Sequence, residues 1–446
     1  MARSDRLGTF VAPRPCPALI RALVPLNRWV CLHGVPGLRS VPWLNAIPGI
    51  RGVTDVTAID LPAADAARLR EALGPGRATF LAPNHPEFFT DWMLDKELSA
   101  RFAPLMASWA THDIVNGMGP LMQRFWLANN LIAQIPGAGG ADGKAHSVRW
   151  ARAGHGVLLH PEGQVAWTAD RIQPLFPGVV EMACAAAGAS PEQRACIAPI
   201  LWHLRFLSDV DAALHRTLDY VDGRLDLRTR RADADAAQRL HDAYLGMLAR
   251  DERAAGIAVT GDDEYAHRWE RAVATFTERI RGLLDDETAQ PPGGSEEAKR
   301  VVRNAERALR RDQEDGRGAR HIELREATQR LRRLLRFDPA WYPAETLTQE
   351  QVAENLQRLR IDYCRGTWRD TVHRFVPRPV GPRIARIRIP PPIDIESDES
   401  PADGQPARQL LSRLQDQMQA TLDALVAEGE RVDPTRRYPN PFRRTS

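Results

Sequence analysis

Lysine is nearly absent from this sequence: only Lys96, Lys144 and Lys299 accompany the arginines among its 60 basic residues. We attribute this bias mainly to genomic composition and assign no function to it. A large excess of one charge is absent too, because 57 acidic residues leave a formal net charge of +3 on 446 residues. A nucleic-acid-binding protein with a dominant basic face is therefore not expected.

Cysteines and long apolar runs are also scarce. The five cysteines are scattered and odd in number, and no two of them have zinc-ligand spacing, so we expect a reducing compartment and no metal site. Nothing in the sequence resembles a cleavable signal peptide, and no apolar stretch reaches transmembrane length. The sequence therefore predicts an intracellular protein that is either soluble or bound to a membrane surface.

The first 50 residues are unusual for the start of a soluble protein. The stretch ALIRALVPLNRWVCLHGVPGLRSVPWL mixes leucine, valine and tryptophan with isolated arginines and contains no acidic residue. Trp29 and Trp43, with arginines close by in the sequence, are typical of a segment that lies in a lipid interface. We therefore predict a membrane-interfacial segment over residues 1–50, and the alternative is a helix packed on the core.

Short apolar runs alternate with helical or glycine-rich stretches between Ala78 and about Phe206. The runs typical of buried strands, bounded by proline or glycine, are ATFLAP, LIAQIP, GVLLHP and CIAPILW. The intervening stretches GKAHSVRWARAG and GVVEMACAAAG are typical of helices that end at glycine. Strands that alternate with helices predict an α/β fold, in which helices flank a mostly parallel sheet.

The pattern changes after residue 207, where apolar residues recur at helical spacing, as in YAHRWERAVATFTERI. Towards the end, RIARIRIPPPIDI alternates isoleucine with arginine and predicts a strand with one solvated face, followed by an amphipathic helix in LLSRLQDQMQATLDALVAE. A lone strand and helix cannot bury themselves, so we expect them to complete the earlier sheet. The predicted organisation is an α/β domain formed by residues 51–207 and 376–431, a helical insertion at 208–375 and a tail at 432–446.

A first polar cluster, Asn84-His85-Pro86-Glu87, directly follows the predicted strand ATFLAP. Functional groups of parallel sheets gather at the carboxyl ends of the strands, so His85 is expected at such an edge. Thr90 can cap a helix that begins at Asp91, which would turn this carboxylate back towards His85. A carboxylate that accepts the proton of one imidazole nitrogen makes the other nitrogen a better base. The alternative is a turn with a polar rim.

A second polar cluster, His160-Pro161-Glu162-Gly163, ends the predicted strand GVLLHP. A glycine that follows a glutamate at a strand end lets backbone N–H groups approach a bound anion closely. His160 borders this cluster and is a candidate substrate contact. Arg171 and the stretch LFPGVVEMA, in which Gly178 opens a helix, lie downstream. The alternative is a βα turn with a surface glutamate.

Together these blocks resemble the glycerophospholipid acyltransferase family, whose members acylate glycerol 3-phosphate or lysophosphatidic acid. The blocks that carry the resemblance are Asn84-His85 followed by Asp91, the strand into Pro161-Glu162-Gly163, the Phe-Pro-Gly helix entry at 176–178, and IAPI. LIAQIP stands where the second motif of the family lies, and Pro199 where the fourth does. The resemblance covers about residues 78–206 and extends more weakly to 383–427.

This resemblance implies an acyltransferase that moves a fatty acyl group from an acyl thioester to a hydroxyl of a glycerolipid or lysophospholipid. His85 would be the general base that takes the proton of the acceptor hydroxyl, and Asp91 would orient and stabilise its imidazole. The acyl donor would be acyl-coenzyme A or acyl-carrier protein, with no cofactor or metal, and the enzyme would work in the cytoplasm at the inner face of the membrane. The residues that would contribute to substrate binding are Asn84, Glu162, Gly163 and Arg171.

Two departures from the family pattern leave alternatives open. Five residues separate His85 from Asp91, one more than is usual, and this spacing makes Glu87 a rival partner for the imidazole. The arginines with which the second and third motifs hold the acceptor phosphate are also missing, and Gln164-Val165 occupies the place in the third motif.

The missing arginines affect which class of acceptor the sequence predicts. Either Arg149 or Arg171 substitutes for them, or the acceptor is a lipid without a phosphate at that position, such as an amino-acid or sugar lipid. The remaining alternative, from another functional class, is a catalytically inactive lipid-binding protein on the same fold.

Overall fold

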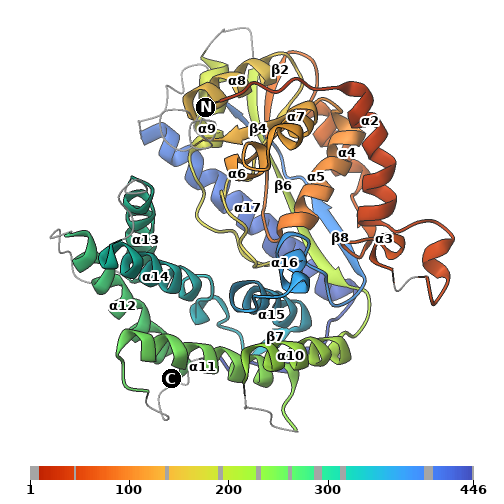
Figure 1. Ribbon diagram of the computed structural model, residues 1–446. Helices are drawn as coiled ribbons and strands as arrows, with labels where there is room; N and C mark the ends of the chain where they lie inside the picture. The colour runs from red at the N-terminus through yellow and green to blue at the C-terminus, as the bar shows by residue number, and fades with distance from the viewer. Residues whose placement is uncertain are drawn as a thin grey trace. The chain divides into compact units, whose positions relative to one another are not determined.

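The structure is a computed structural model that describes residues 10–44, 47–135, 140–188, 194–227, 233–259, 264–285, 294–311, 318–395 and 405–443 (Figure 1). The chain forms two compact units. The first comprises Met1–Ser208 and Val372–Pro434, and the second comprises Asp209–Thr371 and Thr435–Ser446. The chain therefore leaves the first unit after residue 208 and returns to it at residue 372, whereas the sequence pattern predicts these passages after residues 207 and 375.

The first unit is built on a mixed sheet of eight strands, and the predicted α/β fold with a mostly parallel sheet is confirmed. The order across the sheet is β1-β8-β6-β2-β5-β3-β4, and β9 also pairs with β6. Neighbours are parallel, except that β6 runs antiparallel to β8 and to β9. The strands are β1 (Val56–Asp60), β2 (Arg77–Pro83), β3 (Ala107–Thr111), β4 (Leu131–Gln134), β5 (Val157–Leu158), β6 (Arg194–Phe206), β8 (Arg383–Arg388) and β9 (Ile393–Ile395).

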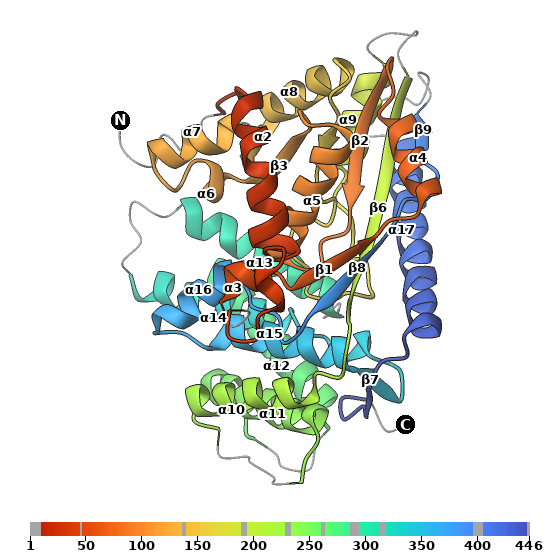
Figure 2. The ribbon, with the colours of Figure 1, turned by 90° about the vertical axis from the view of Figure 1, so that its right-hand side faces the viewer.

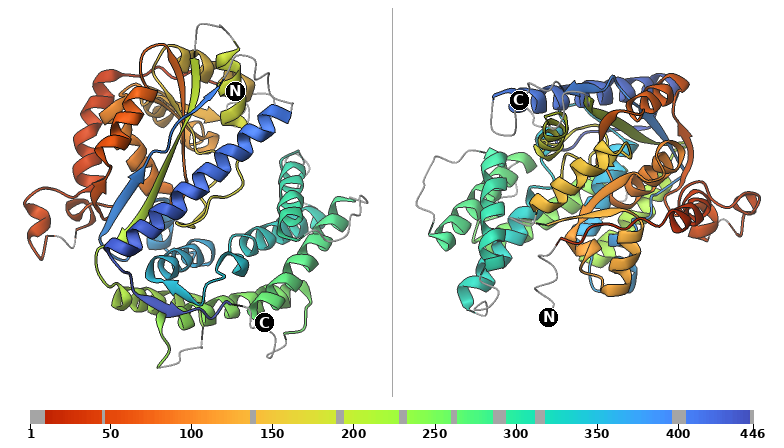
Figure 3. Two further views of the ribbon diagram at one scale, coloured as in Figure 1. Left: turned by 180° about the vertical axis from the view of Figure 1, so that it is seen from behind. Right: turned by 90° about the horizontal axis from the view of Figure 1, so that it is seen from above.

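Helices cover both faces of this sheet, which is why its central strands are continuous apolar runs in the sequence. In β2, Phe80 and Ala82 belong to a core with α8, α9 and α17, whereas Leu81 points into a second core with α4 and α5. Figures 2 and 3 show α17 lying along β6. The helices on the sheet are α4 (Ala63–Ala72), α5 (Phe88–Phe102), α6 (His112–Val115), α7 (Pro120–Ala128), α8 (Gly140–Arg152), α9 (Gly178–Ala187) and α17 (Gln405–Val432).

The arginine-isoleucine stretch differs from its prediction. It forms two strands, β8 and β9, because three consecutive prolines without N–H donors separate them. Its arginines were expected on a solvated face, but Arg383 is only 4% exposed and Arg386 only 5%. Both are paired with carboxylates instead, Arg383 with Glu87 and Arg386 with Asp433. The prediction of a wet face was wrong because this sheet is covered on both sides.

The N-terminal segment packs on α5 with part of its surface and exposes the rest. It contains α2 (Pro17–Pro25), η1 (Leu26–Leu32), η2 (Leu38–Ser40) and α3 (Pro48–Arg51). The Asn27 amide donates to the Met93 carbonyl of α5, and Arg28 forms an ion pair with Glu97. Trp43, by contrast, is 74% exposed. Within the described ranges, none of the helices is both long enough and apolar enough to cross a membrane.

The second unit is mainly helical, in agreement with the periodicity of its sequence. Two of its helices begin at the side-chain caps expected from physical chemistry: Asp235 caps α11, and Thr348 forms a capping box with Gln351 at α15. The short strands β7 and β10 pair antiparallel, and β10 comes from the predicted tail. Part of this tail therefore belongs to the second unit. The elements are α10 (Asp211–Leu225), α11 (Ala236–Ala255), α12 (Tyr265–Leu284), α13 (Gly294–Arg311), α14 (Ala319–Leu334), η4 (Pro339–Trp341), β7 (Thr346–Thr348), α15 (Gln349–Tyr363) and β10 (Arg437–Pro439), with α16 (Trp368–Phe375) spanning the division between the units.

Candidate active site

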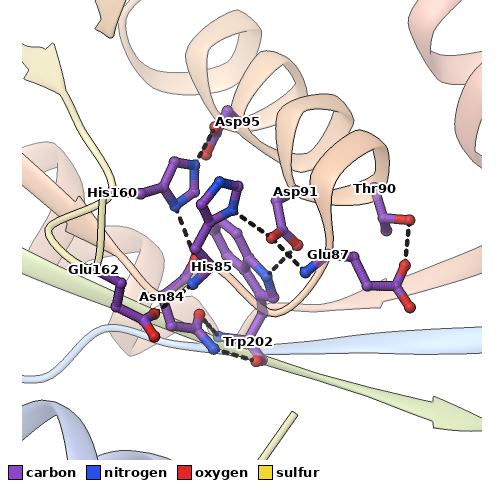
Figure 4. Close-up of polar contacts among 9 residues, drawn as sticks. All are labelled: Asn84, His85, Glu87, Thr90, Asp91, Asp95, His160, Glu162 and Trp202. Carbon is purple, nitrogen blue, oxygen red and sulfur yellow. Dashed lines mark hydrogen bonds and ion pairs between the residues drawn. The ribbon is translucent and has the colours of Figure 1, made fainter. Parts of the chain in front are cut away.

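The two polar clusters meet at one edge of the sheet. Strands β2 and β5 are parallel neighbours, with Phe80 opposite Val157 and Leu81 opposite Leu158. Because their carboxyl ends lie side by side, the loop after β2 and the loop after β5 are brought together. Figure 4 shows His85 from the first loop and His160 from the second lying next to each other above β6.

His85 is hydrogen-bonded to Asp91, and Nδ1 and Oδ2 are 2.9 Å apart. The two carboxylate oxygens of Asp91 also accept N–H bonds, from the Glu87 backbone (2.7 Å) and from Trp202 Nε1 (2.9 Å). An ionised carboxylate can only accept hydrogen bonds, so this arrangement makes His85 Nδ1 the donor. The other ring nitrogen, Nε2, then carries the lone pair, and it has no hydrogen-bond partner among the described residues.

Glu87, the rival partner, is engaged elsewhere. Its carboxylate accepts hydrogen bonds from Thr90 Oγ1 at 2.6 Å and from Arg383 of β8. Helix α5 begins at Phe88, with Glu87 as its N-cap residue, and not at Asp91 as the sequence suggested. Thr90 is therefore inside the first turn of the helix and is not its cap. The extra residue between His85 and Asp91 is absorbed by this earlier helix start, which still turns Asp91 towards the imidazole.

Burial shapes the protonation of this pair. Burial lowers the pKa of His85 well below its usual value, and the neighbouring His160 lowers it further. Burial also raises the pKa of Asp91 well above its usual value, and the charge of Glu87 adds to this effect, whereas the hydrogen bonds from the Glu87 N–H and Trp202 oppose it. His85 is therefore a neutral imidazole near neutral pH, and its side chain remains 15% exposed. A neutral, oriented and accessible imidazole is suited to act as a general base.

Asn84 ties the end of β2 to β6. Its amide nitrogen donates to the Trp202 carbonyl and its amide oxygen accepts from the Trp202 N–H, both at 2.9 Å. The side chain is buried, so these two bonds to one residue fix the backbone from which His85 projects. The structure thus places Asn84 behind the catalytic candidate and not on its open side.

Glu162 is also turned inwards. Its two carboxylate oxygens accept the backbone N–H groups of His85 at 2.7 Å and of Gln173 at 2.9 Å. Burial raises its pKa to about 7, although these two hydrogen bonds act in the opposite direction. Glu162 therefore joins the loop after β5 to the loop after β2.

Gly163 and Arg171 occupy different surroundings. Gly163 adopts a φ of +67°, and a Cβ atom there would lie 2.6 Å from the ring of Phe176, so only glycine fits. The Arg171 side chain is exposed, as is that of Arg149. Neither arginine hydrogen-bonds or ion-pairs with a member of the His85 cluster among the described residues, and a role of either one in holding an acceptor phosphate stays a prediction.

A second histidine-carboxylate pair was not predicted. His160 Nδ1 lies 2.9 Å from the Asn84 carbonyl oxygen and Nε2 lies 3.0 Å from Asp95 Oδ2, so both ring nitrogens face acceptors. Burial lowers the pKa of His160, but Asp95 and the Asn84 carbonyl outweigh this effect and the pKa is raised overall. His160 is therefore a buried cation beside neutral His85. Asp95 follows Asp91 by one helical turn, and this spacing was the available signal in the sequence.

Comparisons with known proteins give no family for this chain. No protein-family model matches it, and no curated protein matches it either. The chemistry of the site therefore has to be inferred from its own atoms. These comprise one histidine with a free basic nitrogen, a carboxylate that fixes its tautomer, and a charged histidine held against it.

Proposed function

We propose that this protein is an O-acyltransferase that moves a fatty acyl group from an acyl thioester to a lipid hydroxyl. The observation that supports the proposal best is the His85–Asp91 pair, in which Nδ1 is held at 2.9 Å from the carboxylate and Nε2 is left without a partner among the described residues. The sequence resemblance to the glycerophospholipid acyltransferases, with their His-Asp motif and Pro-Glu-Gly block, supports the same reaction.

In the proposed reaction, His85 Nε2 takes the proton of the acceptor hydroxyl while the hydroxyl oxygen attacks the thioester carbonyl carbon. The tetrahedral intermediate then expels the thiolate, the carbon–sulfur bond breaks, and the thiolate takes the proton back from His85. The products are an ester and a free thiol. Asp91 remains ionised throughout and stabilises the imidazolium that forms between the two steps.

The acyl donor would be acyl-coenzyme A or acyl-carrier protein, and the acceptor a glycerolipid or lysophospholipid. One observation favours a second class of acceptor, without a phosphate: Gln164 stands in the third motif, and Arg149 and Arg171 are exposed and outside the His85 cluster. An amino-acid or sugar lipid would need no arginine pair at this position. We place the enzyme in the cytoplasm, peripheral to the inner face of the membrane, with the N-terminal segment in contact with lipid.

A transfer assay tests this proposal. The full-length protein is incubated with radiolabelled acyl-coenzyme A or acyl-carrier protein and a panel of lysophospholipid, amino-lipid and glycolipid acceptors. We expect an esterified product with at least one acceptor, and a loss of about 1,000-fold in rate for His85→Ala. His267→Ala is the control, because His267 is exposed on α12 of the second unit.

Two outcomes would count against the proposed reaction or against the role of His85 in it. Full transfer by His85→Ala would remove this histidine from the reaction. Binding of the lipids without transfer under any condition would favour the inactive lipid-binding protein.

A further inference from the structure

A largely apolar cavity of about 220 Å³ lies in the first unit between the N-terminal segment, α5 and α7. Leu23 and Val24 of α2 form one wall, and Phe89 and Trp92 of α5 form another. His85, Asp91 and the other members of the active-site cluster do not line it. An engineered apolar cavity of about 150 Å³ is enough to bind benzene, so this one has room for part of a small ligand.

Unpartnered hydrogen-bonding atoms belong to the residues that line this cavity. Trp92 Nε1 and Trp126 Nε1 are buried N–H donors without an acceptor among the described residues, and Asn27 Oδ1 is a buried acceptor without a donor. Trp126 as a whole is only 7% exposed. Buried polar groups in folded proteins are nearly always satisfied, so these three atoms are exceptions, but they have almost no accessible surface and therefore lie behind the cavity wall.

A cation is placed in the same cavity. Lys96 of α5 lines it, and its ammonium group has a single long hydrogen bond, of 3.3 Å, to the Asn129 carbonyl oxygen. No carboxylate among the described residues forms an ion pair with Lys96, and the neighbouring Asp95 is committed to His160. Burial lowers the pKa of Lys96 to about 8, as expected for an ammonium that lacks a counter-ion. The site thus combines apolar walls with one cation.

We propose that this cavity binds a free fatty acid, with the carboxylate on Lys96 and the alkyl chain among the apolar side chains. A carboxylate is the ligand group that pairs with an ammonium by a charge-assisted hydrogen bond. Leu26 also lines the cavity and is 50% exposed, so the hydrophobic N-terminal segment forms the wall nearest the solvent. This site is separate from the proposed acyl transfer, and it recognises a free carboxylate, which a thioester or an ester lacks.

Binding is tested by calorimetric titration of the full-length protein with decanoate, methyl decanoate and decanol. We expect decanoate to bind at least tenfold more tightly than the other two. Lys96→Met should abolish this preference while retaining the chain-binding walls, and Lys299→Met, in the second unit, should bind as the wild type does. Methionine is unbranched and only one atom shorter than lysine, and it removes the charge together with one long hydrogen bond to the Asn129 carbonyl, so this variant is expected to fold.

A second variant makes the test independent of Lys96. Ala100→Phe adds a ring to the cavity wall and should weaken binding of all three compounds at least tenfold. Equal binding of decanoate and its methyl ester, unchanged binding by Lys96→Met, or no binding of decanoate would each overturn the proposal. His85→Ala should bind decanoate like the wild type. The test of fatty-acid binding is therefore independent of the test of the proposed transfer reaction.

Discussion

The imidazole rings of His85 and His160 are stacked, with their centroids 4.0 Å apart and their planes at 17° to each other. Each ring bonds a carboxylate of the same helix, His85 to Asp91 and His160 to Asp95. The two pairs differ in charge, because His160 faces acceptors at both nitrogens whereas His85 keeps one nitrogen free. A cation is thereby held against a base, and it opposes protonation of that base.

The first prediction follows from this stacking. His160→Gln removes the positive charge beside His85, so the pKa of His85 should rise and the acid limb of the pH–rate profile should move up by about one pH unit. The rate at pH 6 should then fall more than the rate at pH 8, because less His85 is neutral. His155→Gln, which changes a histidine outside the cluster, should leave the limb in place. An unshifted limb in His160→Gln would mean that the two rings titrate independently.

The second prediction distinguishes the two carboxylates near His85. In Asp91→Asn, the amide oxygen can still accept from Trp202, but its NH₂ group then faces both His85 Nδ1 and the Glu87 backbone N–H. His85 must take the other tautomer, with the proton on Nε2, and loses its basic nitrogen. We expect transfer to fall by about 10³- to 10⁴-fold in a variant that still folds but is less stable, because the Glu87 N–H loses its acceptor; initial rates and circular dichroism measure the two effects.

Glu87→Gln is the matched comparison. It should keep transfer within about threefold of the wild type but leave buried Arg383 without its carboxylate partner, which costs about 3 kcal/mol in urea denaturation. If Glu87→Gln lost transfer and Asp91→Asn kept it, Glu87 would be the partner of the base.

The local part of the site could be read from the sequence, because it depends on short spacings. A histidine just after a strand and an aspartate in the first turns of the next helix are close in the chain, and their hydrogen bond requires only that the helix start nearby. Asp95 was within reach of the same reasoning, since it lies four residues after Asp91. Trp202 could not be predicted in this way, because it lies on β6 and contacts Asp91 only as a result of the strand order in the sheet.

The sheet shows the same division between local and tertiary information. Short apolar runs bounded by proline or glycine predicted β2, β4, β5 and β6, whereas β1 (VTAID) and β3 (ASWAT) are too rich in alanine, serine and threonine to stand out. The sequence pattern predicts that the arginines of β8 face solvent, because their ion-pair partners are distant in the sequence. Glu87, the partner of Arg383, is 296 residues away. Their burial depends on a tertiary contact that no local pattern contains.

The third prediction concerns Gly163. Gly163→Ala must place a Cβ atom at a φ of +67° and 2.6 Å from the Phe176 ring, and should lower the free energy of unfolding by about 2 kcal/mol. Because Gly163 follows Glu162, which holds the His85 backbone, transfer should fall as well. Gly178→Ala is the control: nothing lies within 4 Å of its added Cβ atom, and thermal denaturation should change little. Equal stability of the two variants would show that the Phe176 ring moves aside freely.

The fourth prediction tests lipid contact by the N-terminal segment. Deleting the segment would also remove the contacts of Asn27 and Arg28 with α5, so a point substitution is cleaner. Trp43→Ser removes a 74% exposed indole and should weaken co-sedimentation with anionic vesicles by roughly tenfold. Trp368→Ser removes an 80% exposed indole from α16 and should have no such effect. Equal losses in both variants would indicate nonspecific adsorption through exposed aromatics.

The fifth prediction uses the titration of Lys96. Burial lowers its pKa from 10.5 to about 8, so between these values the unfolded chain binds more protons than the folded protein and stability rises with pH. Below about pH 8 both states are protonated, and the cost of the partly buried charge is fully present. Lys96→Met should therefore be more stable than the wild type by about 2 kcal/mol at pH 7, with allowance for partial exposure.

This advantage should shrink as the pH is raised towards 10, because the wild-type lysine is then neutral in the folded protein. Urea denaturation of both proteins at pH 7, 8.5 and 10 measures the difference, and comparing them cancels the other groups that titrate in this range. Lys299→Met, which loses a lysine paired with Glu296 on α13, should show no such trend. A stability gap that stays constant with pH would mean that Lys96 is solvated in the folded protein, and the cavity would then lack its charged wall.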